Sequence, residues 1–328
     1  MSSGLHHDIT DVPGIRVGHW SDTDALTGVT VILPPEKGAR AGLYVGGAAP
    51  STRQMDSLSP FHVVDRIHGV CLCGGSAFGL DAAGGVLAAL EEAGIGFPVV
   101  GRTIPIVPAA AIFDLNIGNG SVRPGAAMGR AALAAATDGP ILQGSVGAGT
   151  GATVGKLFGI EQAMKGGLGS ASVAAGDLVV GALVVVNAYG DIWGPKGEIL
   201  AGARTSLSSL DLADAHRLLS HGLAVSRRVA VENTTLSVIA VNAACDKVTA
   251  TRIATQATPG LAAVIKPFQS HIDGDLTLVL SVGSLKADPN QIALLAIEAL
   301  QQSVFRAIQH ADGFGVLPAW KDRCARTP

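Results

Sequence analysis

The sequence predicts a single α+β domain with buried sheets, on three observations. The 328 residues are 48% hydrophobic and only 15% charged, which is enough apolar material for a large core. The stretch Leu178–Asn187 is continuously apolar, as is typical of a strand buried on both faces. Strands and helices alternate without a regular βαβ pattern, and no repeat or linker divides the chain. We therefore expect one domain over residues 1–328.

The first half of the chain predicts strands followed by a helix. Residues 15–31 favour strand segments around a turn at Ser21-Asp22, and residues 69–72 favour a short apolar strand. Ser76 is a good N-cap for a helix through Ala93 that Gly94 ends. This helix contains three internal glycines, and an internal glycine costs roughly 1 kcal/mol. We therefore expect close backbone approach at Gly79, Gly84 and Gly85.

The second half predicts two more strands and two helices. Residues 206–221 favour a weakly amphipathic helix that Gly222 ends, and a polar stretch follows at Ser226, Arg227, Arg228 and Glu232. Residues 235–243 and 276–282 favour strands. Asp288-Pro289 is a cap followed by proline at the first helical position. It opens a long amphipathic helix to about residue 311, with Ile292, Leu295, Ala299 and Ile308 near one face.

The charge and hydropathy of the chain argue against nucleic-acid and membrane partners. The net charge is −3, aromatic residues are 4%, and no basic run exceeds Arg227-Arg228. Mean hydropathy is high, at +0.41. However, the longest uncharged stretch, residues 139–155, is rich in glycine, and the N-terminal residues lack a basic-then-apolar signal. We expect a soluble cytoplasmic protein.

The cysteines and histidines show no pattern of metal ligands. The four cysteines, Cys71, Cys73, Cys245 and Cys324, include no CxxC pair, and the first two alternate in an apolar run, as small core residues would. The nine histidines show no HExxH motif. We expect no metal and no cofactor.

Two glycine-rich segments partly imitate known motifs. Residues 147–152 read GxGxxA, but the strand and the acidic residue of a dinucleotide site are not in place. Gly155-Lys156 would fit a phosphate-binding loop only with different residues at Thr150 and Leu157. The alternative is a tight glycine turn with a solvated Lys156. Ser76, after Gly74-Gly75, could be a nucleophile, but a helix cap explains it better.

Two polar segments carry the most information about chemistry. Asn233-Thr234-Thr235 precedes one predicted strand, and Asp273-Gly274-Asp275 precedes the next. Each segment alone has a simpler interpretation, because Asn-Thr-Thr is usually a turn and Asp-Gly-Asp is usually a loop or a cap.

Motifs along nearly the whole chain resemble one peptidase family. They are Gly14 to His19, Thr27 to Val31, Gly46 to Arg53 with Asp56, Gly74 to Asp81, Ile112 to Asp114, Gly147 to Lys156, Val186-Asn187, Asn233 to Thr235 and Asp273 to Asp275. Their order and spacing resemble the self-processing peptidase family typified by L-aminopeptidase/D-esterase (DmpA). That family includes β-peptidyl aminopeptidases and nylon-oligomer hydrolases.

The resemblance implies a self-cleaving precursor. The bond Asn233-Thr234 would break, giving an α chain of residues 1–233 and a β chain of residues 234–328. Thr234 would then be the N-terminal nucleophile, and Asp273 and Asp275 the pair that orients it. Asn187 would stabilise the oxyanion, and Lys156 would add positive charge near the nucleophile.

The resemblance also implies a fold, an activity and an assembly. The fold would be a four-layer αββα sandwich of the N-terminal-nucleophile type. The activity would be that of an aminopeptidase on small peptides, amides or esters, and the assembly a homo-oligomer, commonly a tetramer of αβ units. Phe113 and Asp114 would be substrate-binding residues, and because several relatives carry tyrosine where this chain has Phe113, substrate preference could differ. The alternatives are an acyltransferase of the ornithine acetyltransferase type and an uncleaved, catalytically silent binding protein.

Overall fold

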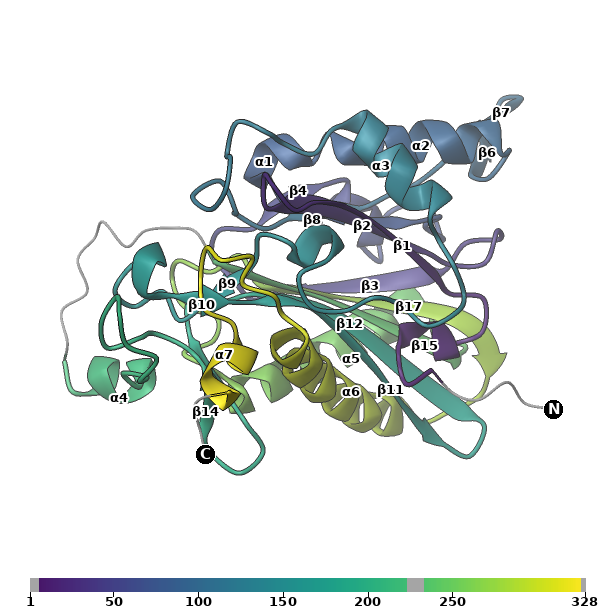
Figure 1. Cartoon of the computed structure of the whole chain (residues 1–328). Helices are drawn as coiled ribbons and strands as arrows, with labels where there is room; N and C mark the ends of the chain where they lie inside the picture. The colour runs from purple at the N-terminus through teal and green to yellow at the C-terminus, as the bar shows by residue number, and fades with distance from the viewer. Residues whose placement is uncertain (1–5, 223–232, 326–328) are drawn as a thin grey trace.

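A computed structural model describes residues 6–222 and 233–325 of the chain (Figure 1). The predicted polar stretch at Ser226, Arg227, Arg228 and Glu232 lies outside these residues. Within the described ranges, no helix is long and apolar enough to span a membrane.

The first of two five-stranded sheets is built mainly from the N-terminal third of the chain. Its strand order is β1-β2-β5-β8-β4, and all neighbours are antiparallel except β5 and β8. The strands are β1 (Arg16–Asp22), β2 (Thr27–Leu33), β5 (Val70–Cys73), β8 (Ala109–Ala111) and β4 (Ser51–Arg53).

The second sheet carries the longest strands. Its order is β11-β12-β15-β17-β3, with β15 and β17 parallel and the other neighbours antiparallel. The strands are β11 (Gly167–Ala175), β12 (Leu178–Asn187), β15 (Thr234–Ala243), β17 (Leu276–Leu285) and β3 (Arg40–Val45). The three central strands alternate between two apolar environments, so this sheet is buried on both faces.

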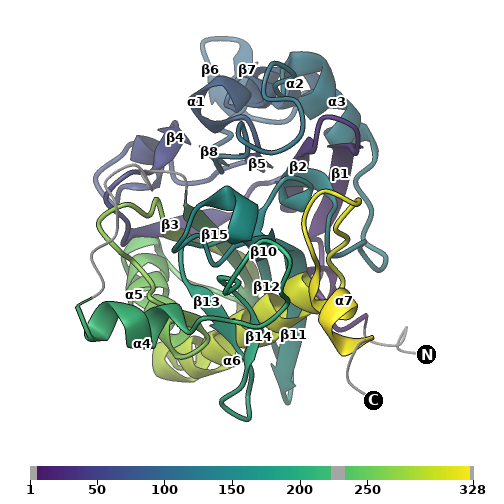
Figure 2. The ribbon, with the colours of Figure 1, turned by 60° about the vertical axis from the view of Figure 1, so that its left-hand side comes forward.

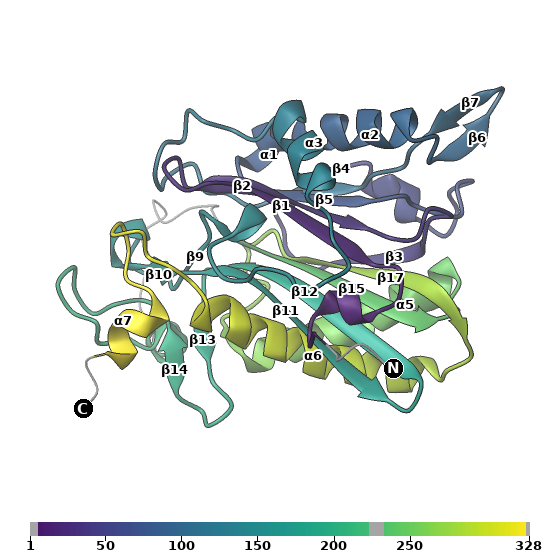
Figure 3. The same ribbon diagram turned by 45° about the vertical axis from the view of Figure 1, so that its right-hand side comes forward.

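Helices cover the outer face of each sheet, which gives four layers (Figures 1 and 3). α2 (Ala82–Glu92) and α3 (Ala126–Ala134) pack on the first sheet, and α5 (Lys247–Ala257) and α6 (Pro289–Gln309) pack on the second. A third apolar cluster, which includes Leu72 and Val238, fills the space between the sheets. The predicted αββα sandwich is therefore confirmed.

Shorter elements surround the sandwich (Figure 2). The short helices are α1 (Ser76–Gly79), α4 (Ala215–Ser220) and α7 (Trp320–Cys324). Three small sheets pair β6 (Phe97–Val99) with β7 (Arg102–Ile104), β9 (Thr153–Val154) with β10 (Met164–Lys165), and β13 (Asp191–Trp193) with β14 (Ile199–Ala201) and β16 (Ile265–Lys266). The 3₁₀ turns are η1 (Ile9–Asp11), η2 (Met55–Leu58), η3 (Gly147–Gly149), η4 (Ile160–Gln162) and η5 (Thr258–Ala263).

The elements with the strongest hydrophobic pattern are those predicted best. The apolar run Leu178–Asn187 is β12, residue for residue, and the predicted strands at 235–243 and 276–282 are β15 and most of β17. The predicted long helix is α6, where the Asp288 carboxylate caps the first turn by accepting from the Asn290 N–H at 2.9 Å. Cys71 and Cys73 are buried in the apolar cluster under α2 and α3, as predicted.

The predicted helix from Ser76 to Ala93 is wrong in its start and its continuity. Gly75, at φ +79°, occupies the N-cap position, and the Asp114 carboxylate accepts its N–H at 2.6 Å. Ser76 is therefore inside the first turn and does not cap it. The helix is interrupted at Leu80 and Asp81, where successive N–H groups bond three residues back instead of four.

The predicted helix at residues 206–221 is also wrong over most of its length. Only α4 is helical, and Asp214 caps it by accepting from Arg217 N–H at 2.9 Å. The preceding residues are held in a loop because the Arg204 guanidinium donates to the carbonyl groups of Leu207 and Ser209. The first predicted turn is displaced as well, since β1 ends at Asp22 and the turn follows it.

Close backbone approach explains two of the three helical glycines. A Cβ on Gly79 would lie 1.8 Å from the Gly74 carbonyl oxygen, and one on Gly85 would lie 1.8 Å from that of Ala126. The second contact lets α2 and α3 pack closely over the first sheet. The expectation fails at Gly84, where a Cβ would meet only the end of the Arg53 side chain at 4.0 Å.

Candidate active site

Thr234 and Asn187 face each other at one end of the inter-sheet layer. Thr234 is the first residue of β15, Asn187 is the last residue of β12, and the two are direct partners in the antiparallel ladder. Directly opposed residues project from the same face of a sheet with Cβ atoms ~4.5–5.5 Å apart. On that face the next residue of β15, Leu236, packs between the two sheets. The hydroxyl and the amide therefore lie side by side on the same face of the second sheet.

The carbonyl group of Asn233 receives two hydrogen bonds in the intact chain. The Thr234 hydroxyl donates to the Asn233 carbonyl oxygen at 2.6 Å, and the Gly274 N–H donates to the same oxygen at 2.8 Å. All three residues are close in space because Asn233 and Asp273 form a parallel bridge that extends the β15–β17 pairing. Two donors on one carbonyl polarise it, and the hydroxyl lies directly beside the bond that it would attack.

The side-chain amide of Asn187 is fixed on both sides. Its Oδ1 accepts from the Thr153 N–H at 3.0 Å, from the Thr153 hydroxyl at 3.3 Å and from Lys156 Nζ at 2.9 Å. Its Nδ2 donates to the Phe113 carbonyl oxygen at 3.1 Å. Because its oxygen faces donors and its nitrogen faces an acceptor, the hydrogen-bond pattern sets which way the amide points.

Lys156 is buried, with 4% of its surface exposed, so the solvated lysine of the alternative hypothesis is wrong. Its Nζ donates to both the Oδ1 and the backbone carbonyl of Asn187, at 2.9 and 3.0 Å. Its positive charge also acts on Asp273, where it lowers the pKa of the carboxyl against the effect of burial. Lys156 therefore binds the amide directly and acts through its charge on one of the two carboxyl groups, Asp273.

Asp273 and Asp275 are two buried, neighbouring carboxyl groups. Burial raises the pKa of Asp275 to about 7, with a further contribution from the charge of Asp273, and burial likewise raises the pKa of Asp273. Asp275 accepts from the N–H groups of Thr235 at 2.6 Å and Gln269 at 3.1 Å. Asp273 Oδ2 accepts from the Ser270 N–H at 2.7 Å, whereas its buried Oδ1 has no partner in the described structure.

Phe113 and Asp114 occupy different positions relative to these groups. The Phe113 backbone carbonyl contacts the Asn187 amide, so this residue borders the site. The Asp114 carboxylate is turned toward the Gly75 N–H at 2.6 Å and the Thr27 hydroxyl at 2.9 Å. Burial raises the pKa of Asp114 to about 6 despite these bonds.

Three contacts of the site were not predicted from the sequence as functional. Thr153 holds the Asn187 amide, the Gly274 N–H binds the Asn233 carbonyl, and the Ala49 N–H donates to the Asp273 carbonyl oxygen at 3.0 Å. Each contact uses a backbone N–H, and residue type says little about where a backbone N–H points. All three residues nevertheless lie inside the motifs on which the family resemblance rests.

Among the residues that the structure describes, no three histidine, cysteine, aspartate or glutamate side chains lie close enough together to hold a metal ion.

The fold and the comparisons define the class of protein as a hydrolase with the N-terminal-nucleophile fold. The structure is similar to that of a β-aminopeptidase from a Burkholderia species, with a TM-score of 0.68 and 25% identity over 94% of this chain and 88% of that one. It is also similar in fold to the L-aminopeptidase D-Ala-esterase/amidase of Ochrobactrum anthropi, with a TM-score of 0.72 and 19% identity over 94% and 87% of the two chains.

The family model of peptidase family S58 matches residues 7–316, and the chain belongs to this family. An uncharacterized aminopeptidase of Mycobacterium tuberculosis is 35% identical over 96% of this chain and 97% of its own length. A 6-aminohexanoate-oligomer endohydrolase of a Kocuria species is 30% identical over 90% of this chain and 84% of its own length. These findings confirm the hydrolase class and do not favour an acyltransferase or a silent binding protein.

Proposed function

We propose that the chain cleaves itself between Asn233 and Thr234 and that the new N-terminal Thr234 then hydrolyses small peptides or amides as an aminopeptidase. The observation that carries the proposal is the 2.6 Å contact between the Thr234 hydroxyl and the Asn233 carbonyl oxygen, directly opposite the Asn187 amide. A turn or a loop cap would not need these groups buried together: Asn233, Thr234 and Asn187 are each at most 5% exposed.

Self-cleavage would begin with an acyl shift within Thr234. Its oxygen forms a bond to the Asn233 carbonyl carbon, the bond from that carbon to the Thr234 nitrogen breaks, and the hydroxyl proton passes to the departing nitrogen. Water then hydrolyses the resulting ester, leaving a carboxylate on Asn233 and a free amine on Thr234. The Gly274 N–H, already 2.8 Å from the carbonyl oxygen, is placed to stabilise the negative charge that develops there.

Hydrolysis of a substrate would use the amine that this cleavage creates. An α-amino group has a reference pKa of ~7.7–8, so near neutral pH a useful fraction can accept the hydroxyl proton. The Thr234 oxygen attacks the substrate carbonyl, the amine product leaves with a proton, and water releases the acyl group. Asn187 Nδ2 would donate to the oxyanion, and Lys156, 2.9 Å from Asn187 Oδ1, would hold that amide and add positive charge.

The two carboxyl groups fit a role in holding the new N-terminus. A charged carboxylate beside the amine would favour the ammonium form, so Asp273 and Asp275 are better suited to orient Thr234 than to activate it. Asp275 binds the Thr235 N–H at 2.6 Å, which fixes the backbone beside the nucleophile. The unpartnered Oδ1 of Asp273, next to Asn233 in the ladder, is available to the amine after cleavage.

Two neighbouring residues, Phe113 and Asp114, bear on the choice of substrate. Phe113 borders the Asn187 amide and has no hydroxyl to donate, so its ring would offer the substrate an apolar contact. Asp114 would contribute indirectly, because its carboxylate anchors the segment that carries Phe113 to Gly75 and Thr27. Relatives act, by their names, on L-amino acid, β-amino acid and 6-aminohexanoate substrates, which defines the classes to be screened.

The proposal extends to the assembly and the location of the protein. We propose a cytoplasmic homo-oligomer, expected to be a tetramer of cleaved αβ units. An oligomer could cover two strongly exposed apolar side chains on one loop, Phe61 at 99% and Val63 at 85%. Size-exclusion chromatography with light scattering would measure the mass directly, and a monomeric mass would exclude the oligomer.

The experiment that tests the hydrolase proposal is a screen of p-nitroanilides of L-, D- and β-amino acids and of 6-aminohexanoate. The purified protein should release p-nitroaniline from at least one class. Thr234→Ala should release none, whereas Thr255→Ala, a control at an exposed threonine of α5, should stay active. Activity that survives Thr234→Ala would show that the nucleophile is misassigned.

A further inference from the structure

Lys165 is the largest side chain that the described part of the protein buries completely, at 0% exposure. It ends the short strand β10 and is the ladder partner of Thr153 in β9. Burial lowers the pKa of its ammonium to about 7, against the opposing effect of the Asp114 and Asp312 carboxylates. Burying a lysine ammonium costs free energy unless its N–H donors are paired with acceptors. No step of the mechanism above uses it.

The ammonium of Lys165 binds two backbone carbonyl groups in the segment beside the active site. Its Nζ donates to the Thr150 carbonyl oxygen at 2.7 Å and to the Ala152 carbonyl oxygen at 3.0 Å. The Gly166 N–H also donates to the Ala152 oxygen, at 2.9 Å. These bonds fix the position of the Ala152-Thr153 peptide group.

That peptide group is also the one that holds the Asn187 amide. The carbonyl of Ala152 and the N–H of Thr153 belong to a single planar unit, and the Thr153 N–H donates to Asn187 Oδ1 at 3.0 Å. A donor on the carbonyl side of a peptide polarises its N–H and strengthens the bond that the N–H makes. Lys165 and Asn187 are thus joined through one rigid peptide, from ammonium to amide oxygen.

We propose that Lys165 is a positioning residue for the Asn187 amide, which it orients toward the nucleophile through the Ala152-Thr153 peptide. This inference rests on the proposed role of Asn187 as the oxyanion donor. Without Lys165 the peptide can tilt, and Asn187 Oδ1 then loses an aligned donor. Lys156 would still bind the amide oxygen, so the site would be loosened but not dismantled.

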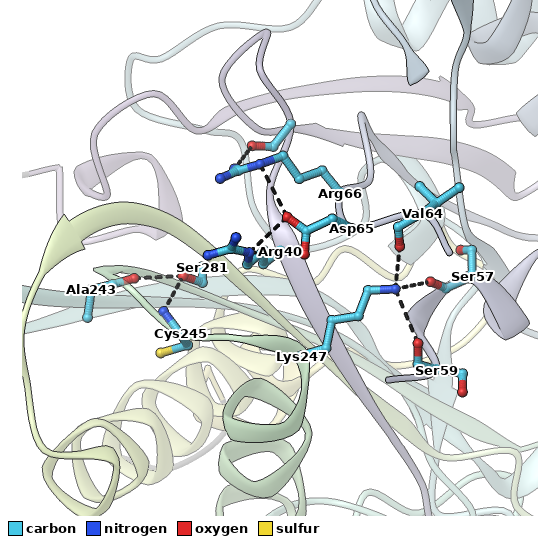
Figure 4. A network of polar contacts seen from close by, with 11 residues as sticks. Arg40, Ser57, Ser59, Val64, Asp65, Arg66, Ala243, Cys245, Lys247 and Ser281 are labelled. Carbon is cyan, nitrogen blue, oxygen red and sulfur yellow. Dashed lines mark hydrogen bonds and ion pairs between the residues drawn. The ribbon is translucent and has the colours of Figure 1, made fainter. Parts of the chain in front are cut away.

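A second buried lysine provides a matched control. Lys247, at 7% exposure, donates from Nζ to the carbonyl oxygens of Ser57, Ser59 and Val64 at 2.8, 3.2 and 2.5 Å (Figure 4). Like that of Lys165, its ammonium group binds backbone carbonyl groups. Its acceptors, however, lie in η2 and the loop that follows it rather than in the segment that holds Asn187. Replacing Lys247 therefore removes the same kind of interaction without touching the proposed relay.

The test is a double-mutant cycle on the steady-state kinetics of the mature enzyme. Lys165→Met should lower kcat by about tenfold, the value of one well-aligned hydrogen bond, and leave KM within about twofold. In an Asn187→Ala background the same substitution should lower kcat by less than about twofold, because the group that it positions is gone. Lys247→Met should leave kcat within about twofold of wild type.

Equal kcat penalties for Lys165→Met in both backgrounds, or no penalty in either, would overturn the proposal. If Lys165→Met does not accumulate as folded protein, Lys165→Gln replaces it in the cycle, with the same loss of effect expected in the Asn187→Ala background. The proposed function fails differently: wild type would then lack hydrolase activity, or Asn187→Ala would keep the wild-type kcat. In either of those cases the proposed positioning role of Lys165 is excluded as well.

Discussion

Gly274 is the position where a single methyl group should interfere most directly with self-cleavage. A Cβ on Gly274 would lie 2.8 Å from the Thr234 hydroxyl oxygen, 2.8 Å from the Ala49 carbonyl oxygen and 3.1 Å from Pro50 Cα. Ordinary carbon contacts begin at ~3.5 Å. The Thr234 hydroxyl oxygen and the Ala49 carbonyl oxygen must therefore each move away from the new methyl group by more than half an ångström. The Thr234 side chain is the mobile one, and its displacement breaks the 2.6 Å contact with the Asn233 carbonyl.

The expected magnitude for Gly274→Ala follows from the cost of overpacking. A methyl group forced into a packed site costs ~1–3 kcal/mol, which corresponds to roughly 5- to 150-fold in a rate that depends on the displaced group. We expect the half-life of the precursor to lengthen by a factor in that range. Intact and cleaved chains would be separated on denaturing gels at timed intervals after synthesis in a cell-free system.

The control for this substitution is Gly125→Ala. Gly125 has φ −135° and a Cβ there would meet nothing within 4 Å, so alanine should be accommodated and the wild-type half-life kept. Circular dichroism would verify that both variants fold. A Gly274→Ala protein that folds and cleaves at the wild-type rate would refute the assignment of the scissile bond to this position.

Three further predictions concern the nucleophile, the substrate and pH. Thr234→Ala should remain a single chain, and Thr234→Ser, which keeps a hydroxyl, should still cleave, both read by denatured mass; normal cleavage of the alanine variant would contradict the account. Phe113→Tyr adds a hydroxyl to the residue whose backbone carbonyl binds the Asn187 amide and should change the ratio of kcat/KM between p-nitroanilide classes, whereas an unchanged ratio would show that Phe113 does not border the substrate. Asp191 is fully buried, and burial raises its pKa from 3.8 to about 6 although it accepts from the N–H groups of Ala203 and Ala215. Its folded-state pKa lies above the unfolded value, so its contribution to stability is present below pH 4 and is lost as the pH rises through 6. Relative to Asp191→Asn, the free energy of unfolding of wild type should fall by about 2 kcal/mol between pH 4 and pH 7 in urea titrations, and a constant difference would contradict this.

The elements that the sequence predicted best are those whose own residues determine them. β12 is a continuous apolar run and α6 carries both a cap and an apolar stripe, so local pattern and tertiary burial agree. The predicted helix at residues 206–221 failed because the Arg204 side chain binds the carbonyls of Leu207 and Ser209, a tertiary arrangement that no periodicity encodes. The break after α1 likewise depends on backbone hydrogen bonds that are made three residues back, which residue type does not specify.

In the candidate site, too, residue types were predictable from the sequence and backbone contacts were not. Thr234, Asn187, Lys156, Asp273 and Asp275 were named from motifs, and the structure brings them to neighbouring strand ends. Lys165 was missed because a lysine is normally exposed, whereas here its side chain is completely buried. Its link to Asn187 runs through a backbone peptide, which has no signature in residue identity.

The central claim, self-cleavage before Thr234, is tested most directly by the denatured intact mass of the purified protein combined with sequencing of its new N-terminus. The account predicts two pieces of roughly 23 and roughly 10 kDa from the 33.0 kDa chain, the smaller beginning with Thr234-Thr235-Leu236. A single species of 33.0 kDa after prolonged incubation, or a new N-terminus at any other residue, would contradict it.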